Sequence, residues 1–416
     1  MIKYVDNLVK EAKVNSYKLA VLNSAVKNKI INTMAESLLK NKRFIIKENL
    51  KDITSAKKNR FNKSVIDRLT LNEKRINEMA ISLKEISSLD DPVGRVIKGW
   101  RRPNGIFINK VKVPIGVILI IYEARPNVTS DCIGLCFKSS NIAILRGGSS
   151  AFYSNKAIFK VLKDSVQKEK ISFSPFFLIE KTDYKVVDLL LKKSDFIDLV
   201  IPRGGESLIK KVAQNSSIPV IKHYKGVCHI FVDEFADYRK ALKICINAKV
   251  QRPSVCNAVE TILVHKKIAK NFLPLLKKEF DKFKVKIKGD HNTKKILKDI
   301  ILAKESDWFT EYLDLIVSVK IVSHLQEAVD HINFYGSHHT DSIITENINN
   351  ADVFVNTVDS ACCFVNISTR FSDGYQFGLG AEIGISTDKL HTRGPMGLED
   401  LTTYKYVVYG NGQIRG

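Results

Sequence analysis

The sequence predicts an α/β protein made of two parallel, doubly wound sheets that follow a helical segment. Short apolar runs recur from residue 113 onward, and helix-like segments separate them. The residues before this point have a helical spacing of apolar side chains instead. Strands that are apolar on both faces and alternate with helices are typical of parallel sheets covered on both sides.

The N-terminal segment carries an apolar stripe with a spacing of three and four residues, which predicts an amphipathic helix. The stripe consists of Leu19, Leu22, Val26, Ile30 and Met34. Asp90–Gly94 reads as a turn that ends this helical part of the chain.

Two sets of apolar runs predict the strands of the two sheets. The first set is Ile115–Ile121, Ile142–Leu145, Phe176–Ile179, Ile197–Ile201 and Pro219–Ile221. The second set is His229–Val232, Glu260–Val264 and Leu315–Ile321, and it predicts a second α/β domain that starts near residue 227. Gly105–Lys112 and Leu401–Tyr409 are also β-like, and we expect them to pair as a small extra sheet.

The composition is that of a globular protein with no membrane or disordered character. Of the 416 residues, 44% are hydrophobic and 26% are charged. The longest apolar run, Val113–Tyr122, is far too short to span a bilayer, and the charged N-terminus shows no secretory signal. The seven cysteines form no CxxC pair. These features predict a cytoplasmic protein with no membrane partner.

The net charge of +22 invites comparison with nucleic-acid-binding proteins. The excess is lysine, since only 15 of the 66 basic residues are arginine, and the lysines are scattered along the chain. Scattered lysine favours solvated helix faces over a binding surface. We therefore expect no nucleic-acid partner.

Two glycine turns predict a dinucleotide site. Each follows a predicted strand, precedes a predicted helix and contains an arginine. Glycine lets a ligand approach the backbone, and the following helix N-terminus attracts phosphate. Neither turn has the GxGxxG fingerprint, which disfavours an ordinary Rossmann dehydrogenase. The predicted cofactor-binding residues are Arg146, Gly147, Gly148, Arg203, Gly204 and Gly205.

Cys256 is the candidate nucleophile. It lies in the polar segment Gln251–Asn257, where Arg252 offers a positive neighbour. A single cysteine is more often a small buried apolar residue. That interpretation fits the other cysteines, which lie in helix-like or apolar surroundings: Cys132, Cys136, Cys228, Cys245, Cys362 and Cys363.

Metal and serine-hydrolase chemistry lack their sequence signatures. The nine histidines show no HExxH spacing, and the adjacent pair His338 and His339 would tend to point to different faces. No GxSxG elbow is present. We expect no metal.

Seven segments together resemble the gamma-glutamyl phosphate reductase family, also called glutamate-5-semialdehyde dehydrogenases. They are Tyr122–Thr129, Ile201–Gly205, Gly226–His229, Gln251–Asn257, Ser368–Gly374, Phe377–Glu382 and His391–Leu398. The resemblance runs over essentially the whole chain in the family's order. It is specific to this family rather than to aldehyde dehydrogenases in general.

The resemblance implies an aldehyde dehydrogenase-like fold with three parts. These are an NADP-binding domain (1–104 and 113–226), a catalytic domain (227–390) and a small β oligomerisation arm (105–112 and 391–416). It implies NADPH-dependent reduction of L-glutamyl 5-phosphate to L-glutamate 5-semialdehyde and phosphate, the second step of proline biosynthesis. It further implies a homo-oligomer and an association with glutamate 5-kinase.

The resemblance also implies roles for individual residues. Cys256 matches the nucleophile, and Asn127 matches the side chain that donates to the oxyanion in the wider superfamily. Arg146 matches a position near the adenosine ribose. Many members carry lysine after the two glycines of that turn, whereas this chain carries Ser149.

Arg370 is the candidate for holding the α-carboxylate of a glutamyl substrate, because a guanidinium matches a carboxylate bidentately. It follows the run Cys363–Ile367, where the superfamily places its substrate-anchoring loop. Arg125 and Phe371 are the other predicted substrate-binding residues. A surface ion pair is the alternative interpretation of Arg370.

Two other functions stay open: a hydrolytic NAD(P)-dependent aldehyde dehydrogenase and a basic nucleic-acid-binding protein. The first needs a carboxylate that activates water. The superfamily places it in the segment that corresponds to His223–His229, which has none here. The second needs clustered arginine and aromatic residues, which are not evident. Because the carboxylate that would activate water is missing, the sequence predicts phosphate as the acyl acceptor.

Overall fold

The computed structural model describes residues 1–222 and 225–415, and for residues 63 and 64 it describes the backbone alone. The chain forms two compact units. Unit 1 is Met1–Lys222, Gly378–Gly384 and Met396–Gly416; unit 2 is His223–Phe377 and Ile385–Pro395. A separate two-stranded sheet pairs β14 (Gly384–Ser386) with β15 (Gly394–Met396).

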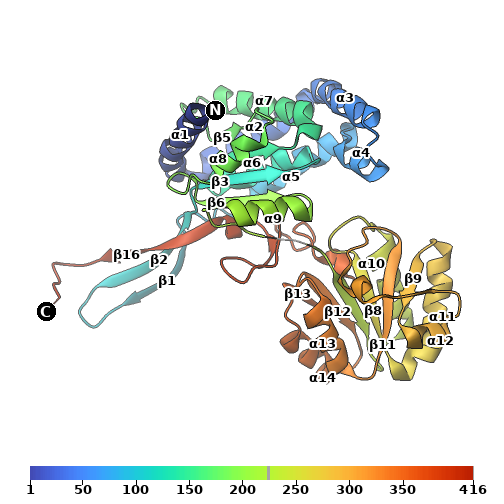
Figure 1. Cartoon of the computed structure of the whole chain (residues 1–416). Helices are drawn as coiled ribbons and strands as arrows, with labels where there is room; N and C mark the ends of the chain where they lie inside the picture. The colour runs from blue at the N-terminus through green and yellow to red at the C-terminus, as the bar shows by residue number, and fades with distance from the viewer. Residues whose placement is uncertain (223–224, 416) are drawn as a thin grey trace. The chain divides into compact units, whose positions relative to one another are not determined.

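Unit 1 begins with five helices (Figure 1). They are α1 (Ile2–Ala20), α2 (Ser24–Lys40), α3 (Lys42–Lys58), α4 (Lys63–Leu69) and α5 (Glu73–Ser88). The single helical stripe expected from Leu19 to Met34 is wrong as one helix. Asn23 is an N-cap whose side chain accepts from the Val26 N–H, so a new helix begins there.

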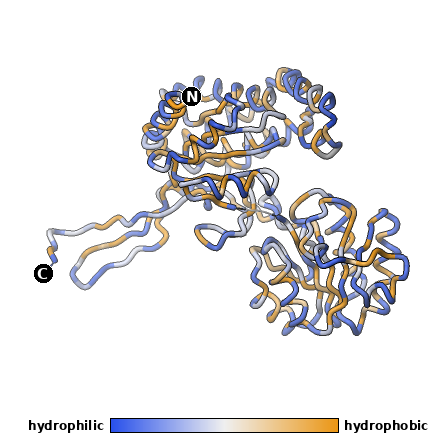
Figure 2. Tube along the Cα trace, in the orientation of Figure 1, coloured by the Kyte–Doolittle hydropathy of each residue, from blue (hydrophilic) through white to orange (hydrophobic). Residues whose placement is uncertain are grey.

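A four-stranded parallel sheet forms the centre of unit 1, in the order β5-β4-β3-β6. The strands are β3 (Val117–Tyr122), β4 (Ile142–Gly147), β5 (Phe176–Leu178) and β6 (Leu199–Arg203). The connecting helices are α6 (Asn127–Lys138), α7 (Phe152–Lys168), α8 (Tyr184–Leu190) and α9 (Glu206–Asn215), with a 3₁₀ turn η1 (Ser149–Ala151) before α7. All six side chains of β3 are buried, and its apolar trace is visible in Figure 2.

The expected strand Pro219–Ile221 is not a strand in the structure. It contributes one isolated bridge, between Val200 and Val220. Proline lacks the N–H that would extend a ladder from this end, which limits the pairing.

A separate three-stranded antiparallel sheet joins residues distant in sequence, in the order β1-β2-β16. The strands are β1 (Val96–Arg101), β2 (Phe107–Pro114) and β16 (Thr402–Tyr409), and β16 follows the 3₁₀ turn η4 (Glu399–Leu401). The expected pairing of the two β-like stretches is confirmed, whereas β1 was not expected. In Figure 1 this sheet extends away from the rest of unit 1.

Unit 2 contains a seven-stranded parallel sheet in the order β10-β9-β11-β8-β7-β12-β13. Its strands are β7 (Cys228–Val232), β8 (Val259–His265), β9 (Lys286–Gly289), β10 (Ile301–Leu302), β11 (Ile316–Val322), β12 (Thr340–Ile344) and β13 (Cys362–Val365). Its helices are α10 (Tyr238–Val250), α11 (Lys266–Lys282), α12 (His291–Ile296), α13 (Leu325–Tyr335) and α14 (Ile348–Thr357), with 3₁₀ turns η2 (Glu305–Phe309) and η3 (Thr369–Phe371).

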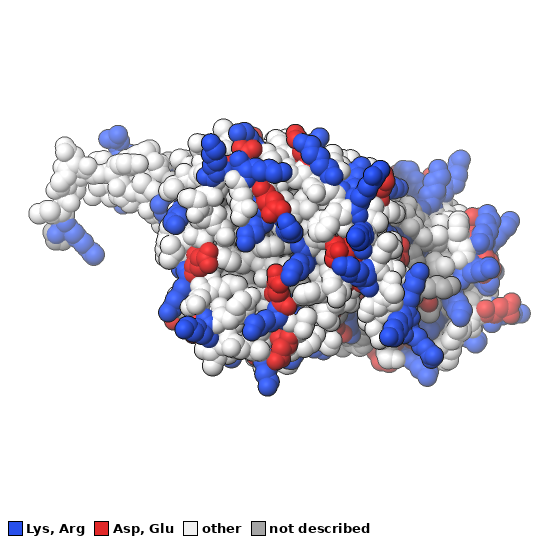
Figure 3. Space-filling model, turned by 90° about the horizontal axis from the view of Figure 1, so that it is seen from above, with Lys and Arg blue, Asp and Glu red and all other residues white. Residues whose placement is uncertain are grey.

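The surface and the helices carry two further findings. In the part of the chain that the structure describes, no helix combines the length and apolarity needed to cross a bilayer. On the face drawn in Figure 3, basic side chains are spread among acidic ones rather than gathered in one stripe.

Candidate active site

Cys256 lies in a loop at the amino edge of the seven-stranded sheet. The segment Gln251–Asn257, here named the cysteine loop, connects α10 to β8. β7 and β8 are parallel neighbours, so their amino ends share one edge of the sheet. Gly226, just before β7, therefore meets Cys256, just before β8.

The remaining cysteines have the properties of structural residues. Cys132, Cys136, Cys228, Cys245 and Cys362 are buried, whereas Cys256 and Cys363 are half-buried. Burial raises the thiol pKa of Cys132, Cys136, Cys228 and Cys245, and it raises the pKa of Cys363 to about 11. These thiols are protonated at neutral pH, which makes them poor nucleophiles.

The backbone of Gly226 packs directly on Cys256. A Cβ at Gly226 would lie 1.9 Å from the Cys256 carbonyl oxygen, so only glycine fits. The Gly226 N–H donates to Glu311 Oε1 at 2.9 Å, and Cys228 Sγ–H donates to the Cys256 carbonyl at 3.2 Å. The backbone of Cys256 is thus held from the β7 side.

Arg370 holds the cysteine loop from a second side. Its Nε donates to Gln251 Oε1 at 2.8 Å, and its Nη1 donates to Asn257 Oδ1. Asn257 Nδ2 in turn donates to the Ser372 carbonyl at 2.8 Å. The segment around η3 is therefore tied to both ends of the loop that carries Cys256.

The surroundings of the Arg370 guanidinium disfavour its positive charge. Burial lowers its pKa, and the positive charge of Arg252 lowers it further; Asp373 and Cys256 act in the opposite direction. Two guanidinium groups close enough to affect each other favour an anion at this place.

A fully buried ion pair flanks the cysteine loop. Lys249 Nζ, at the end of α10, lies 2.7 Å from Glu260 Oε2 at the start of β8. Glu260 Oε1 also accepts from the Leu313 N–H at 3.3 Å. Burial raises the pKa of the Glu260 carboxyl group and lowers the pKa of Lys249. Sequence reasoning missed this pair; its one signal was a glutamate inside the apolar run of β8.

In unit 1, Asn127 is the first residue of α6 and its side chain is exposed. Its Nδ2 donates to Asp131 Oδ2 at 3.2 Å, and Ser82 Oγ donates to the other oxygen at 3.1 Å. Burial raises the pKa of Asp131 to about 6. Asn127 and Cys256 belong to different units, so their pairing at one reaction centre stays a prediction.

The sheet order of unit 1 reverses between β3 and β6, where α/β proteins of this kind bind ligands. Glu123 follows β3, and Gly204 and Gly205 follow β6. Glu123 Oε2 accepts from the Gly205 N–H at 3.2 Å, and a Cβ at Gly204 would lie 2.5 Å from that oxygen. A carboxylate thus stands at the α9 N-terminus that the sequence assigned to phosphate.

In the glycine turn that follows β4, the two glycines have different surroundings. A Cβ at Gly147 would lie 2.1 Å from Asn155 Nδ2, so this glycine serves packing. Gly148 has looser surroundings, with its nearest neighbour, the Cα of Glu123, at 3.5 Å from such a Cβ. Gly148 is therefore the glycine of this turn with room for a ligand.

Two arginines beside these turns have buried nitrogens with unused hydrogen-bonding capacity. Arg146 is 3% exposed and its Nη2 donates to the Thr182 carbonyl at 2.9 Å. Among the described residues, neither its Nε nor that of Arg203 has a hydrogen-bond partner. Buried donors without acceptors are costly. They fit an anionic ligand such as a dinucleotide at the carboxyl ends of β4 and β6.

Arg125 and Phe371, the other predicted substrate-binding residues, belong to different units. Arg125 lies in the turn between β3 and α6, in unit 1. Phe371 ends η3 in unit 2 and is 42% exposed. Their contact with substrate stays a prediction.

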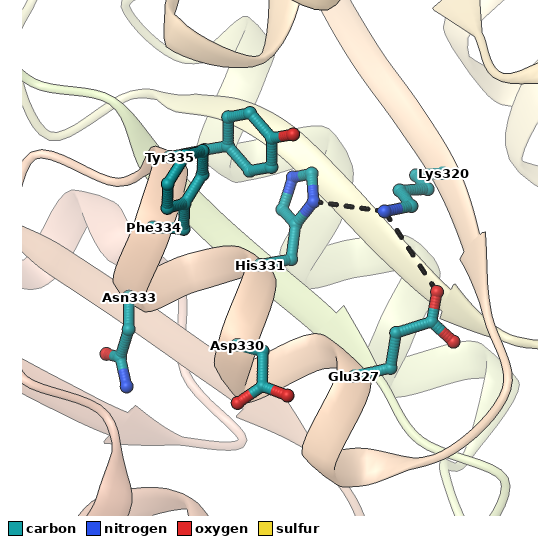
Figure 4. A pocket seen from close by; sticks show the side chains of 7 residues that line it. All are labelled: Lys320, Glu327, Asp330, His331, Asn333, Phe334 and Tyr335. Carbon is teal, nitrogen blue, oxygen red and sulfur yellow. Dashed lines mark hydrogen bonds and ion pairs between the residues drawn. The ribbon is translucent and has the colours of Figure 1, made fainter.

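A hollow of about 570 Å³ in unit 2 contains none of the predicted site residues (Figure 4). Its lining includes Lys320, whose Nζ lies 3.3 Å from His331 Nδ1. Burial lowers the pKa of His331 to about 2, which keeps this imidazole neutral and unsuited to acid–base catalysis at neutral pH. No group of three histidine, cysteine or acidic side chains suited to a metal occurs in residues 1–222 and 225–415.

Comparisons with known proteins agree with this architecture. The model of the aldehyde dehydrogenase family matches residues 3–296. The gamma-glutamyl phosphate reductase of Nautilia profundicola is 53% identical over 100% of both chains. The crystal structure of gamma-glutamyl phosphate reductase from Thermotoga maritima is 46% identical, with a TM-score of 0.96 over 99% of this chain and 100% of that one.

A more distant structure shares the fold alone. An engineered glycolyl-CoA reductase with bound NADP⁺ is 14% identical, with a TM-score of 0.69 over 97% of this chain and 96% of that one. The expected aldehyde dehydrogenase-like fold is thereby confirmed. From the family model and the full-length identity together, the chain belongs to the gamma-glutamyl phosphate reductase family of the aldehyde dehydrogenases.

Proposed function

We propose that this chain catalyses the NADPH-dependent reduction of L-glutamyl 5-phosphate to L-glutamate 5-semialdehyde and phosphate, the second step of proline biosynthesis. The observation that carries the proposal is the cysteine loop. Its half-buried thiol is the one that lies in a polar turn, with its backbone held by Gly226 and its flanking side chains held by Arg370. The names of the relatives support the same reaction.

The chemistry assigns covalent catalysis to Cys256. Its thiolate attacks the acyl carbon, phosphate leaves, and a thioester remains. When bound, NADPH would supply the hydride that reduces the thioester carbon. The resulting thiohemiacetal releases the semialdehyde and returns the thiolate. Asn127 Nδ2 and the Cys256 N–H donate to the oxyanions, where one lost donor typically costs about 2.7–4 kcal/mol.

The substrate is a multiply charged anion, and the cysteine loop has matching charge. Arg252 and Arg370 lie close enough to repel each other, and an anion between or beside them relieves that repulsion. Arg370 has further N–H donors beyond those bonded to the loop, so it can hold the α-carboxylate and the loop together. Arg125 and Phe371 complete the proposed substrate side.

The cofactor is proposed to bind along the carboxyl ends of β4 and β6. The Nε atoms of Arg146 and Arg203, which have no hydrogen-bond partner in the described part of the chain, support anion binding there. The residues assigned to it are Arg146, Gly147, Gly148, Arg203, Gly204 and Gly205.

Further proposals concern location, partners and domains. We place the protein in the cytoplasm as a homo-oligomer that associates with glutamate 5-kinase. The three-stranded sheet β1-β2-β16 supports self-association, because β16 exposes Tyr404, Tyr406 and Tyr409. The three-part domain division given by the family resemblance is retained as part of this proposal.

The test runs the reaction backwards, with L-glutamate 5-semialdehyde and NADP⁺, and follows NADPH absorbance. We expect turnover in phosphate buffer and nearly none in phosphate-free buffer, with the acyl phosphate as product. Sustained phosphate-free turnover to glutamate would instead establish the hydrolytic aldehyde dehydrogenase.

Two cysteine variants locate the chemistry. Cys256→Ser should abolish turnover while nucleotide binding persists, since a hydroxyl is a far weaker nucleophile at pH 7. Cys245→Ser is the matched control, because Cys245 is fully buried in α10 and should affect stability more than turnover. Wild-type kcat in Cys256→Ser would disprove the assignment.

A further inference from the structure

We propose that Lys211 and Tyr184 complete, with Arg146, a site for the phosphate monoester that distinguishes NADPH from NADH. This inference rests on the proposed function, because it names the residues that select that cofactor. The three side chains come from α9, the start of α8 and the end of β4, all in unit 1.

Two cations share one aromatic ring at this place. Lys211 Nζ and Arg146 Cζ each lie 4.9 Å from the centre of the Tyr184 ring. The ring is attracted to both cations by its quadrupole, and it therefore keeps both of them at this end of the sheet. Tyr184 is 49% exposed, so the cluster is open to a ligand from solvent.

Arg146 supplies donors that the protein itself leaves unused. Arg146 is only 3% exposed. Its Nη2 donates to the Thr182 carbonyl, and its Nε has no hydrogen-bond partner among the described residues. A buried guanidinium in this state gains most from an anionic acceptor, because charge-assisted hydrogen bonds are the strong ones.

The carboxylates next in sequence are engaged elsewhere. Glu180 pairs with Lys156 at 2.7 Å, and Asp183 accepts from the Lys185 N–H at 2.9 Å as the N-cap of α8. The turn after β4, residues 147–151, contains no cation of its own. Lys211, reaching over from α9, is therefore the second charge that a dianionic phosphate needs beside Arg146.

This cluster lies at the carboxyl ends of the strands, the edge of the sheet where ligands bind in α/β proteins. Arg146 is at the carboxyl end of β4, and Thr182 follows β5, its neighbour in the sheet. A dinucleotide that crosses the switch point between β3 and β6 extends its adenosine along this edge. A phosphate on the adenosine ribose would then meet the cluster of Tyr184, Lys211 and Arg146.

The test measures binding rather than turnover, with 2′,5′-ADP and 5′-AMP as probes in isothermal titration calorimetry of the full chain. Lys211→Ala should weaken 2′,5′-ADP about 10-fold or more, in line with about 1.5–3 kcal/mol for a hydrogen bond to a charged group. Its affinity for 5′-AMP should change less than about 2-fold. Tyr184→Leu should weaken 2′,5′-ADP in the same selective way.

Lys210→Ala is the matched control, since Lys210 is the adjacent lysine and pairs with Glu206 at 2.8 Å. It should bind both probes like the wild type. Unchanged 2′,5′-ADP affinity in Lys211→Ala, or equal losses for both probes, would overturn the inference while the proposed reaction stands. A wild-type chain that binds 2′,5′-ADP no better than 5′-AMP would overturn the NADPH assignment itself.

Discussion

Gly226→Ala should damage catalysis through the backbone of Cys256. The added Cβ would lie 1.9 Å from the Cys256 carbonyl oxygen and 2.5 Å from its Cα and carbonyl carbon, whereas real Cβ atoms essentially never approach other atoms within 3.0 Å. The two backbones must therefore separate by about 1 Å. A displacement of that size at a nucleophile can cost about 10²-fold in rate. Overpacking of a buried site also costs about 1–3 kcal/mol in stability.

The assay compares kcat, the iodoacetamide reactivity of Cys256 and Tm for Gly226→Ala. The control is Gly289→Ala in the same unit, where the Cβ would meet the side chains of Ile300 and Thr293. We expect a lower Tm in both variants, with loss of kcat in Gly226→Ala alone. A Gly226→Ala enzyme with kcat within about 3-fold of wild type would refute the backbone argument, given the rate sensitivity to placement.

Three further changes test the surrounding contacts. Arg370→Lys should raise KM for the acyl phosphate about 10-fold or more and leave NADPH affinity unchanged, because an ammonium cannot replace a guanidinium that makes several directed hydrogen bonds; an unchanged KM would remove Arg370 from the site. Lys249→Met should lower the free energy of unfolding by about 3–5 kcal/mol, and adding Glu260→Leu should restore most of it, because the single change leaves a buried charge unpaired; urea unfolding of the double-mutant cycle measures this, and additive losses would contradict it. Asp131 has a pKa of about 6 when folded and about 3.9 when unfolded, so its contribution to stability is present below about pH 4 and is lost as pH rises through 6. Asp131→Asn should flatten the pH dependence of urea unfolding between these values, and an unaltered slope would show that the carboxyl group titrates normally.

Two of the strands that sequence reasoning found share one property. β3 and β4 are continuous apolar runs buried on both faces, which is the pattern that parallel strands require. β12 escaped prediction because it begins Thr340-Asp341-Ser342, all three fully buried. Their burial depends on partners elsewhere in the chain, such as the bond from Ser360 Oγ to Asp341 Oδ2. No local pattern encodes such partners.

The candidate site also has a part that the sequence predicts and a part that it does not. Cys256 was recognisable because a polar loop around a cysteine is a local feature. The contacts that position it are not local: Gly226 and Arg370 reach the loop from distant segments, and Glu311 accepts from the Gly226 N–H. The rule that ligands bind at carboxyl ends of strands also points away from this loop, which lies at the amino edge of its sheet.

The choice between water and phosphate as acyl acceptor follows from which charges near Cys256 are engaged. Sequence reasoning looked for a carboxylate in the segment before β7, of which residues 223 and 224 lie outside the described part. Among the carboxylates that the structure brings near, Glu311 accepts from a backbone N–H of the segment that packs on the cysteine, and Glu260 is paired with a buried lysine. Using either as a base for water would remove a contact that holds the cysteine loop or its flank. A general base contributes about 10²–10⁴-fold, so hydrolysis without one is slow. Phosphate is already an anion at pH 7, and the mutual repulsion of Arg252 and Arg370 favours an anion at this place. The charge arrangement that suits an acyl phosphate substrate therefore also makes phosphate, rather than water, the better partner for the thioester.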